Sequence, residues 1–318
     1  MKQIYEKITL LKKELSKTVI GQEEMINSLL IGLLCEGHIL VEGAPGLAKT
    51  TTVNALSRAI NLDAKRIQFT PDLLPSDILG IQIYNQKDHS FSIKKGPLFT
   101  NLLLADEINR APAKVQSALL EAMQEKQVTI GDETLKVPAP FLVMATQNPI
   151  EQEGVYRLPE AQLDRFMMKV IVTHNREDEE LEIMKKAATK SFDEISEVFS
   201  LHDLQDAQKA LENIHIDKEL ERYIVQLILA TREPQRFGLE NLAREILFGV
   251  SPRATIDLYK ASRAQAYLAG KTFVSPSDIV SVTHHVLRHR IILSYEARAN
   301  HITHDAIISQ IIQKVPVP

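Results

Sequence analysis

Apolar strand-like runs alternate with helical patterns along the first half of the chain. Near the N-terminus, apolar side chains recur at a spacing that predicts an amphipathic helix, at Ile4, Ile8, Leu11 and Leu15. A second helix is expected from about residue 23 to residue 36, with Gly37 as its C-terminal stop. The apolar runs typical of strands are 38–41, 66–69, 102–105 and 141–146. This alternation predicts an α/β fold in which helices cover a central parallel sheet.

Two segments interrupt this order with alternating apolar and polar residues. A hairpin is expected between residues 81 and 93, around the polar stretch 85–88. Its apolar residues are expected on one face, namely Ile81, Ile83, Phe91 and Ile93. A second hairpin is predicted at 127–137, around Gly131 and Asp132.

Strand patterns fade after about residue 173, and helical patterns replace them. Ser251-Pro252 and Ser275-Pro276 are favourable helix starts, because serine caps a helix and proline suits its first turn. Gly270 is a natural stop between them. The chain is therefore expected to divide into an α/β domain at 1–175 and a smaller all-α domain at 176–318.

Composition narrows the class of protein. The chain has 318 residues, 44% hydrophobic and 25% charged, as in an ordinary globular protein of about two domains. A net charge of −4 and a pI near 6.2 argue against general affinity for nucleic acid or an anionic membrane. The longest uncharged apolar stretch, 29–35, is too short to cross a bilayer. With a single cysteine, Cys35, and no signal-peptide pattern, we expect a cytoplasmic protein.

A glycine-containing loop follows the first apolar run and precedes a helix. Its sequence is Gly43-Ala44-Pro45-Gly46-Leu47-Ala48-Lys49-Thr50, which has the position and spacing of a phosphate-binding loop. Such a loop turns backbone N–H groups and the positive end of a helix dipole towards nucleotide phosphates. Lys49 would reach the terminal phosphates, and Thr50 would ligate Mg²⁺. Because Ala48 stands where glycine is usual, we expect it at a right-handed, helix-compatible φ.

Two acidic residues end the apolar strand at 102–105. Asp106 would support Mg²⁺ coordination, and Glu107 would polarise the attacking water as a general base. Alternatively, both carboxylates could simply cap the helix that follows. Together with the phosphate loop, they predict hydrolysis of a nucleoside triphosphate.

Three further polar residues could assist this chemistry. Asn148 ends the next apolar strand and could orient the water, although an Asn-Pro turn explains it almost as well. Arg165 and Arg253 could stabilise charge on phosphate oxygens in the transition state. A lone arginine is more often a surface residue or a carboxylate partner.

These motifs together resemble the MoxR family of AAA+ ATPases. The resemblance is carried by 43–50, 106–112 (DEINRAP), 116–125 (QSALLEAMQE), 145–149 (ATQNP) and 158–166 (LPEAQLDRF). Segments 251–254 (SPRA) and 286–291 (VLRHRI) are similar to the lid domain of that family. The similarity covers nearly the whole chain. It implies a P-loop AAA+ core with a central parallel sheet and a helical lid, and an alanine before the motif's lysine is common in the family.

The resemblance implies a nucleotide site for ATP and Mg²⁺. Lys49 and Thr50 would form the Walker A pair, and Asp106 and Glu107 the Walker B pair, with Thr50 and Asp106 holding Mg²⁺. The residues that would bind the nucleotide are Gly43, Ala44, Pro45, Gly46, Leu47, Ala48, Lys49, Thr50 and Thr51, with Val19, Ile20 and Gly21 in the adenine pocket.

The remaining motifs acquire roles in the same way. Asn148 would be sensor 1 and Arg253 sensor 2. Arg165 would be the arginine finger that one subunit offers to the ATP of its neighbour. Arg157 stands where relatives often carry proline, and this extra cation makes the finger assignment less exclusive.

The resemblance also implies an assembly. The hairpins at about 79–95 and 127–138 would be the helix-2 insert and the pre-sensor-1 insert, with loops facing the pore of a homo-hexameric ring. Members of this family often act with a protein that bears a von Willebrand factor A domain. They have chaperone-like roles in the remodelling or maturation of a client protein, and such partners are expected here.

Two other functions remain open. A DNA-dependent, helicase-like motor is possible because the same clade contains replicative helicases, although the acidic pI counts against it. A nucleotide-switch scaffold that scarcely hydrolyses ATP is the second, although Glu107 speaks against it. Histidines could bind a metal, since His285 and His289 lie four residues apart and His301 and His304 follow. Otherwise these histidines form a solvated lid surface.

Overall fold

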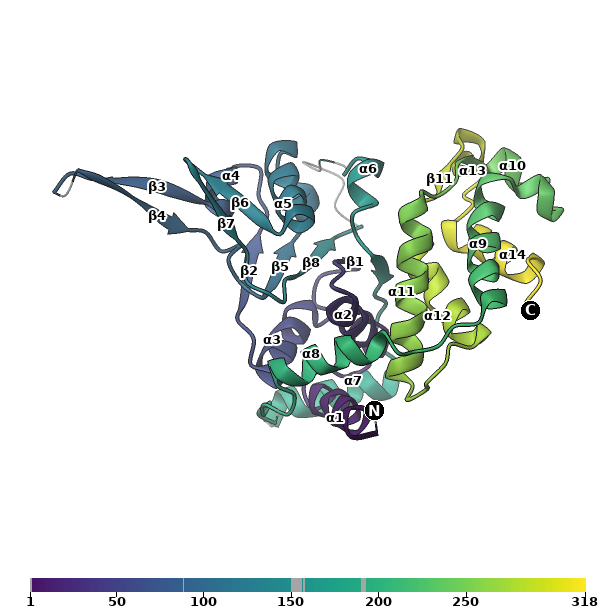
Figure 1. Ribbon diagram of the computed structural model, residues 1–318, viewed down its shortest axis with the longest axis horizontal. Coiled ribbons are helices and arrows are strands. Elements are labelled where there is room, and N and C mark those ends of the chain that lie inside the picture. Colours follow the sequence, from purple (N-terminus) through teal and green to yellow (C-terminus); the bar gives the residue numbers. More distant parts are fainter. Residues whose placement is uncertain (1, 88, 150–155, 157, 190–192) are drawn as a thin grey trace.

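The computed structural model describes residues 2–87, 89–149, 156, 158–189 and 193–318, without the side chains of residues 2–4. A five-stranded parallel sheet in the order β2-β5-β8-β1-β9 forms the centre (Figure 1). Its strands are β1 (Ile39–Glu42), β2 (Ala64–Gln68), β5 (Leu102–Asp106), β8 (Leu142–Gln147) and β9 (Met168–Ile171). The predicted α/β fold is confirmed. Arg157, the extra cation close to the predicted finger, lies outside the described residues.

Alternate side chains of each strand enter two separate apolar cores, as the period of two in a strand requires. Ile39 and Val41 face the first core and Leu40 faces the second. Helices α1 (Lys2–Leu15), α2 (Glu23–Cys35) and α3 (Lys49–Ile60) pack into the first core. The second core contains α4 (Pro75–Leu79), η1 (Ile108–Arg110) and α5 (Ala113–Glu125). A sheet buried on both faces explains why its central strands are almost wholly apolar.

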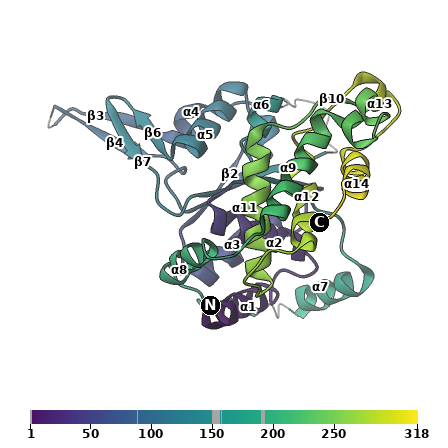
Figure 2. The ribbon, with the colours of Figure 1, turned by 45° about the vertical axis from the view of Figure 1, so that its right-hand side comes forward.

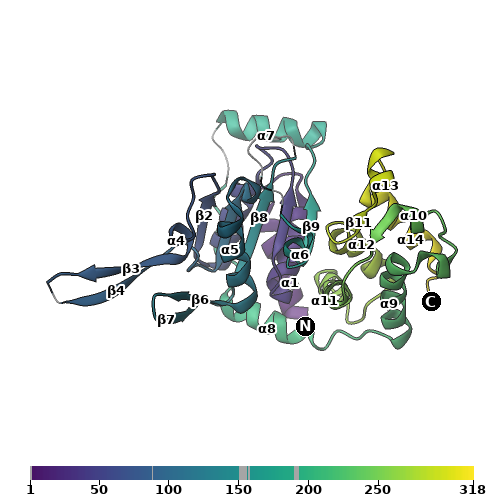
Figure 3. The ribbon, with the colours of Figure 1, turned by 90° about the horizontal axis from the view of Figure 1, so that it is seen from above.

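Both predicted hairpins are present, and they project from the end of the sheet away from the C-terminal helices (Figure 3). They are β3 (Gly80–Asn85) with β4 (Ser90–Lys95), and β6 (Gln127–Ile130) with β7 (Glu133–Lys136). The expectation that the first hairpin has one apolar face is wrong. Ile83 pairs with Ser92, and Phe91 pairs with Tyr84. Directly paired residues share a face of the hairpin. The isoleucines of β3 therefore lie on one face, and Phe91 and Ile93 of β4 lie on the other.

The helices that follow residue 217 form a lid beside the sheet (Figure 1). It contains α9 (Lys218–Arg232), η2 (Pro234–Phe237), α10 (Leu242–Glu245), α11 (Pro252–Leu268), α12 (Pro276–Leu287), α13 (Tyr295–Ala299) and α14 (His304–Lys314). The helical lid is confirmed. The sequence patterns did not predict its one antiparallel ribbon in the described residues, between β10 (Ile246–Phe248) and β11 (Ile292–Leu293).

Two helices lie between the sheet and the lid in the chain. Helix α7 (Glu177–Thr189) is near the N-terminal segment, where Lys186 Nζ donates to Lys17 O at 3.2 Å (Figure 2). Helix α8 (Leu201–Leu211) packs against α2 of the core and against α11 of the lid. The domain boundary at 175/176 therefore stays a prediction.

Helix ends follow the predicted signals with one exception. Ser251 and Ser275 are N-caps with proline at the first helical position, and Gly270 follows α11 at φ 75°. Gly37 is not the left-handed residue after α2, because Glu36 takes that place at φ 53°. A side chain at Gly37 would overlap Met167, so close packing explains this glycine. No helix within the described ranges is long and apolar enough to cross a membrane.

Candidate active site

The phosphate loop connects β1 to α3 at the carboxyl edge of the sheet. Gly46 has φ 86°, a conformation that glycine adopts without strain. Lys49 Nζ donates to Gly43 O at 2.6 Å, which folds the lysine back across its own loop. Burial is the main reason that the pKa of Lys49 is lowered, and the nearby carboxylates of Asp106 and Glu107 oppose that shift.

Ala48 adopts a conformation that the sequence did not predict. It lies at φ 54°, in the left-handed region, so the expected right-handed φ is wrong. Left-handed backbone costs an L-residue roughly 1–2 kcal/mol. The turn from the loop into α3 imposes this geometry. Alanine is tolerated because its side chain is a single methyl group.

Asp106 lies at the end of β5 and is held from two sides. Thr146 Oγ1 on β8 donates to Asp106 Oδ1 at 2.5 Å. Arg66 on β2 approaches Asp106 Oδ2 through Nη2 at 2.7 Å and through Nε at 3.1 Å. Arg66 also donates to Gln68 Oε1 at 2.8 Å. The neighbouring strands therefore fix this carboxylate by parallel pairing on both sides of β5.

Glu107 follows directly and has an unusual backbone. Its φ of 55° turns the chain out of the strand into η1. Its N–H donates to Thr146 Oγ1 at 2.9 Å, and its carboxylate lies 3.2 Å from Arg110 Nη1. One buried hydroxyl therefore positions both acidic residues, because it donates to the side chain of Asp106 and accepts from the backbone of Glu107.

The structure brings most of the predicted site residues into one hollow of about 310 Å³. It is lined by Pro45, Gly46, Leu47, Ala48, Lys49, Thr50, Thr51, Arg66, Asp106, Glu107 and Asn148. The hydroxyl of Thr50 and the carboxylate of Asp106 are hard oxygen donors that suit Mg²⁺. Within the described residues, no group of three His, Cys, Asp or Glu side chains could hold a metal unaided. This donor set therefore suits a metal that arrives with a triphosphate.

Sequence reasoning missed Arg66 and Thr146 in this hollow. Each carried a weak signal, since Thr146 is a polar residue inside an apolar run and Arg66 is a cation two residues from the end of a strand. Their partner, Asp106, is far away in the sequence. Strand order alone brings the three side chains together.

Val19, Ile20 and Gly21 line a separate cavity of about 910 Å³ between the core and the lid helices α11 and α12. Asn175 Nδ2 donates to Ile20 O at 2.9 Å, and Gln22 Nε2 donates to Asn175 Oδ1 at 2.6 Å. These bonds attach the segment to the chain that follows β9. The segment 19–21 therefore lies at the same edge of the sheet as the phosphate loop, because β1 and β9 are parallel.

Arg165 and Arg253 are not brought to the phosphate loop of their own chain. They line a different hollow of about 350 Å³ together with Gly37 and His38, which precede β1. The phosphate loop follows the other end of β1, and the four residues of that strand span ~13 Å. The two arginines therefore share one face at the opposite edge of the sheet.

The lid histidines form a solvated surface only in part, since His301 is exposed whereas His285 and His304 are half-buried. His289 is buried, and its Nε2 lies 2.9 Å from Phe166 O, so that nitrogen carries the hydrogen. Burial is the first cause that lowers the pKa of His289 well below its usual value. His285 lines the large cavity, and burial lowers its pKa as well.

A phosphate loop, an acidic strand end and a helical lid define an AAA+ ATPase, and comparisons with known proteins agree. The model of the ATPase family associated with various cellular activities (AAA) matches residues 38–168, and the AAA lid domain matches residues 240–311. The chain belongs to the MoxR family of these ATPases. It is 45% identical to "Chaperone MoxR1" of Mycobacterium tuberculosis over 305 residues, which cover 96% of this chain and 81% of the relative.

Two further relatives support the same family. "Protein MoxR" of Paracoccus denitrificans is 32% identical over 322 residues, covering 96% of this chain and 94% of the relative. A crystal structure from Cytophaga hutchinsonii, assigned as an ATPase, has a TM-score of 0.94 and 50% identity. The match covers 99% of this chain and 96% of that one.

Proposed function

We propose that the protein hydrolyses ATP to ADP and phosphate and uses this energy for chaperone-like remodelling or maturation of a partner protein. The observation that carries the proposal is the single hollow that contains Lys49, Thr50, Asp106 and Glu107. A binding site for nucleotide needs only the loop and its lysine. A carboxylate beside the terminal phosphates adds a base for water, and this favours hydrolysis over a switch that only binds.

Each side chain of the hollow has a distinct task in this proposal. The loop amides and Lys49 bind the phosphates, while Val19, Ile20 and Gly21 contact the adenine. Thr50 and Asp106 would hold Mg²⁺, which draws charge from the phosphate oxygens when bound. Glu107 polarises the attacking water, and the amide of Asn148 orients that water.

Arg165 and Arg253 support a site shared between subunits. Both line the face opposite the phosphate loop, so neither serves the ATP of its own chain in this arrangement. In a closed ring, that face of one copy meets the phosphate loop of the next. We therefore propose a homo-hexamer in which Arg165, as finger, and Arg253, as sensor 2, act on the ATP of a neighbour.

The hydrolysis proposal is tested with Glu107→Gln, which keeps the shape of the side chain and removes its basicity. Phosphate release should fall by about 10²–10⁴-fold. ATP affinity, measured with a fluorescent nucleotide, should stay within about twofold. Turnover equal to wild type would exclude Glu107 as the base, and turnover that requires DNA would favour a DNA-dependent motor.

The shared site is tested by mixing two inactive variants. Lys49→Ala lacks ATP binding but keeps its arginines, and Arg165→Ala keeps its phosphate loop. If the finger acts between subunits, the mixture should hydrolyse ATP although each variant alone does not. Full activity of Arg165→Ala alone would refute the finger.

The partner proposal comes from the relatives. The name "Chaperone MoxR1" describes the Mycobacterium tuberculosis protein, and its similarity to this chain supports a client protein here. A protein with a von Willebrand factor A domain is the proposed adaptor. Co-purification of the two from the native cell with ATP present should recover both, and recovery independent of nucleotide would contradict coupling to the ATPase cycle.

A further inference from the structure

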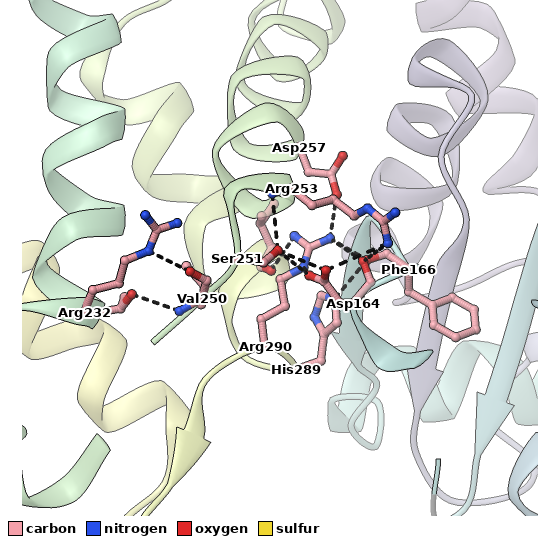
Figure 4. Close-up of polar contacts among 11 residues, drawn as sticks. Asp164, Phe166, Arg232, Val250, Ser251, Arg253, Asp257, His289 and Arg290 are labelled. Carbon is pink, nitrogen blue, oxygen red and sulfur yellow. Dashed lines mark hydrogen bonds and ion pairs between the residues drawn. The ribbon is translucent and has the colours of Figure 1, made fainter. Parts of the chain in front are cut away.

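Both chain neighbours of Arg165 are held by the lid. Ser251 Oγ donates to the two carboxylate oxygens of Asp164 at 3.0 and 2.9 Å. Arg290 Nη2 donates to Phe166 O at 2.8 Å, and His289 Nε2 donates to the same carbonyl at 2.9 Å (Figure 4). Since residues on both sides are bonded to the lid, the backbone at Arg165 cannot shift without it.

Arg290 is the centre of this contact. Its side chain is only 1% exposed, and its Nε forms an ion pair with Asp164 Oδ1 at 2.9 Å. Its Nη2 also bonds to Asp257 on α11, and its Nη1 donates to Val286 O at 3.0 Å. A planar guanidinium can serve all these acceptors at once, whereas a lysine ammonium cannot.

Asp257 is the second carboxylate beside Arg290. Burial raises the pKa of Asp257, and the positive charge of Arg290 opposes that shift. A buried cation between two carboxylates is stable only while all three stay together, because each would otherwise be desolvated without a partner. The contact therefore behaves as one unit.

Arg253 joins the same unit from the lid side. It follows Ser251 and Pro252 at the start of α11, and its Nη1 lies 3.8 Å from Asp164 Oδ2. Its Nη1 also donates to Asp164 O at 3.4 Å. Asp164 thus contacts the lid arginine Arg253 and is the residue directly before Arg165.

We infer that Asp164 and Arg290 are positioning residues that hold Arg165 and Arg253 together for the triphosphate of a neighbouring copy. The inference rests on the proposed function, because it assumes that both arginines act between subunits. We call Asp164 and Arg290 the clamp. It joins a core segment to the lid, so Arg165 and Arg253, which come from different parts of the chain, keep one spacing. A rigid spacing matters because a misplacement of about 1 Å can lower a rate about 100-fold.

Two clamp variants and one matched control test this inference. Asp164→Asn keeps the shape but loses the charge, and Arg290→Lys keeps the charge but loses the planar fork. Arg288→Lys is the control. Arg288 is also a buried lid arginine that contacts the core, where it donates to Lys169 O at 3.3 Å, and it bonds to Asp305 within the lid at 3.0 Å.

We expect both clamp variants to lower kcat about 100-fold while KM for ATP stays within about twofold. The control, Arg288→Lys, should lower the thermal unfolding midpoint about as much as the clamp variants do. Its kcat should stay within about twofold of wild type. Mixing Asp164→Asn with Lys49→Ala should restore turnover, because the second variant supplies well-placed arginines to the ATP of the first. A purely structural role would not produce this rescue.

Two results would overturn the clamp. The first is wild-type kcat in both clamp variants while Arg165→Ala is inactive. The second is a loss of kcat in the clamp variants that mixing with Lys49→Ala does not restore, while the mixture of Arg165→Ala with Lys49→Ala is active. Full activity of Arg165→Ala by itself is a different result. It would refute the proposed finger and, with it, the basis of the clamp.

Discussion

Arg66 Nη2 lies 2.7 Å from Asp106 Oδ2, so the carboxylate proposed to hold Mg²⁺ already has a cationic partner from its own chain. Arg66 is half exposed, at 51%, and an exposed ion pair contributes only about 0–1 kcal/mol. A divalent cation can therefore displace this guanidinium from the Asp106 carboxylate, or share the carboxylate with it, at a small cost in free energy. The pair should raise the Mg²⁺ concentration that the site requires.

We predict that Arg66→Ala lowers the Mg²⁺ concentration for half-maximal ATP turnover by about two- to fivefold. Lys65→Ala is the control, since it removes the same charge from the next residue, whose Nζ donates to Phe99 O. The control should leave the Mg²⁺ titration unchanged. A higher Mg²⁺ requirement in Arg66→Ala would contradict competition and indicate that Arg66 binds the phosphates.

Thr146 is predicted to position both acidic residues. Thr146→Val keeps the volume but leaves Asp106 Oδ1 and the N–H of Glu107 without the hydroxyl, which should destabilise the fold by about 1–3 kcal/mol. Turnover should fall about 10- to 100-fold and recover in Thr146→Ser. Thr283→Val removes another buried hydroxyl, bonded to Ile279 O in the lid, and should keep turnover. Equal effects of both valine variants on turnover would contradict the positioning role.

The left-handed backbone of Ala48 predicts a strict limit on side-chain size. At φ 54° a β-branched residue is strained, so Ala48→Val should weaken ATP binding at least about tenfold. Ala48→Gly relieves the strain and should bind ATP as wild type does, with stability within about 1 kcal/mol. Nucleotide titration of both variants measures the ATP affinity, and thermal unfolding measures their stability. Unchanged ATP binding by the valine variant would show that the loop does not need this conformation.

His38 predicts a loss of stability in acid. Its Nδ1 accepts from Val143 N–H at 3.0 Å and its Nε2 lies 3.1 Å from Met123 O, which fixes a neutral tautomer. Burial lowers the pKa of His38 to about 4. The unfolded chain binds this proton near pH 6.5, so the stabilisation is complete above about pH 6.5 and is lost as the pH falls towards 4.

The free energy of unfolding should therefore fall by up to ~1.4 kcal/mol per pH unit in this window from His38 alone. Denaturant unfolding between pH 7 and 4 should give a shallower slope in His38→Gln than in wild type. His202→Gln is the control, because that side chain is 80% exposed. Identical slopes for wild type and His38→Gln would assign the acid sensitivity to other groups.

Local signals predicted the positions of the phosphate loop and the acidic strand end well. The loop at 43–50 follows a strand and precedes a helix, so its position needs no distant contact. Asp106 and Glu107 end a buried strand, and the carboxyl ends of parallel strands meet at one edge. Strand ends, loop spacing and helix caps depend on residues near one another in the chain, and these predictions were confirmed where the structure describes them, except for the helix stop at Gly37 and the φ of Ala48.

Predictions that depended on the strand register of a hairpin, or on how the lid packs against the core, were wrong or were not made. The hairpin at 80–95 has a four-residue loop between the paired residues Asn85 and Ser90, so odd-numbered residues pair with even-numbered ones. The apolar residues were therefore split between two faces. His289 looked like a surface residue because nothing local shows that the turn after α12, where it lies, packs on Phe166.

The sequence by itself determined a parallel sheet with a phosphate loop and two acidic residues at one edge, because chain spacing and strand direction fix these positions. Only the tertiary structure decided what joins them and what stands apart. Strand order brings Arg66 and Thr146 to Asp106, and lid docking through Arg290 holds Arg253 at the edge opposite the loop. The physical reason is that such contacts join residues far apart in the chain, whose meeting depends on packing and buried charge rather than on local pattern.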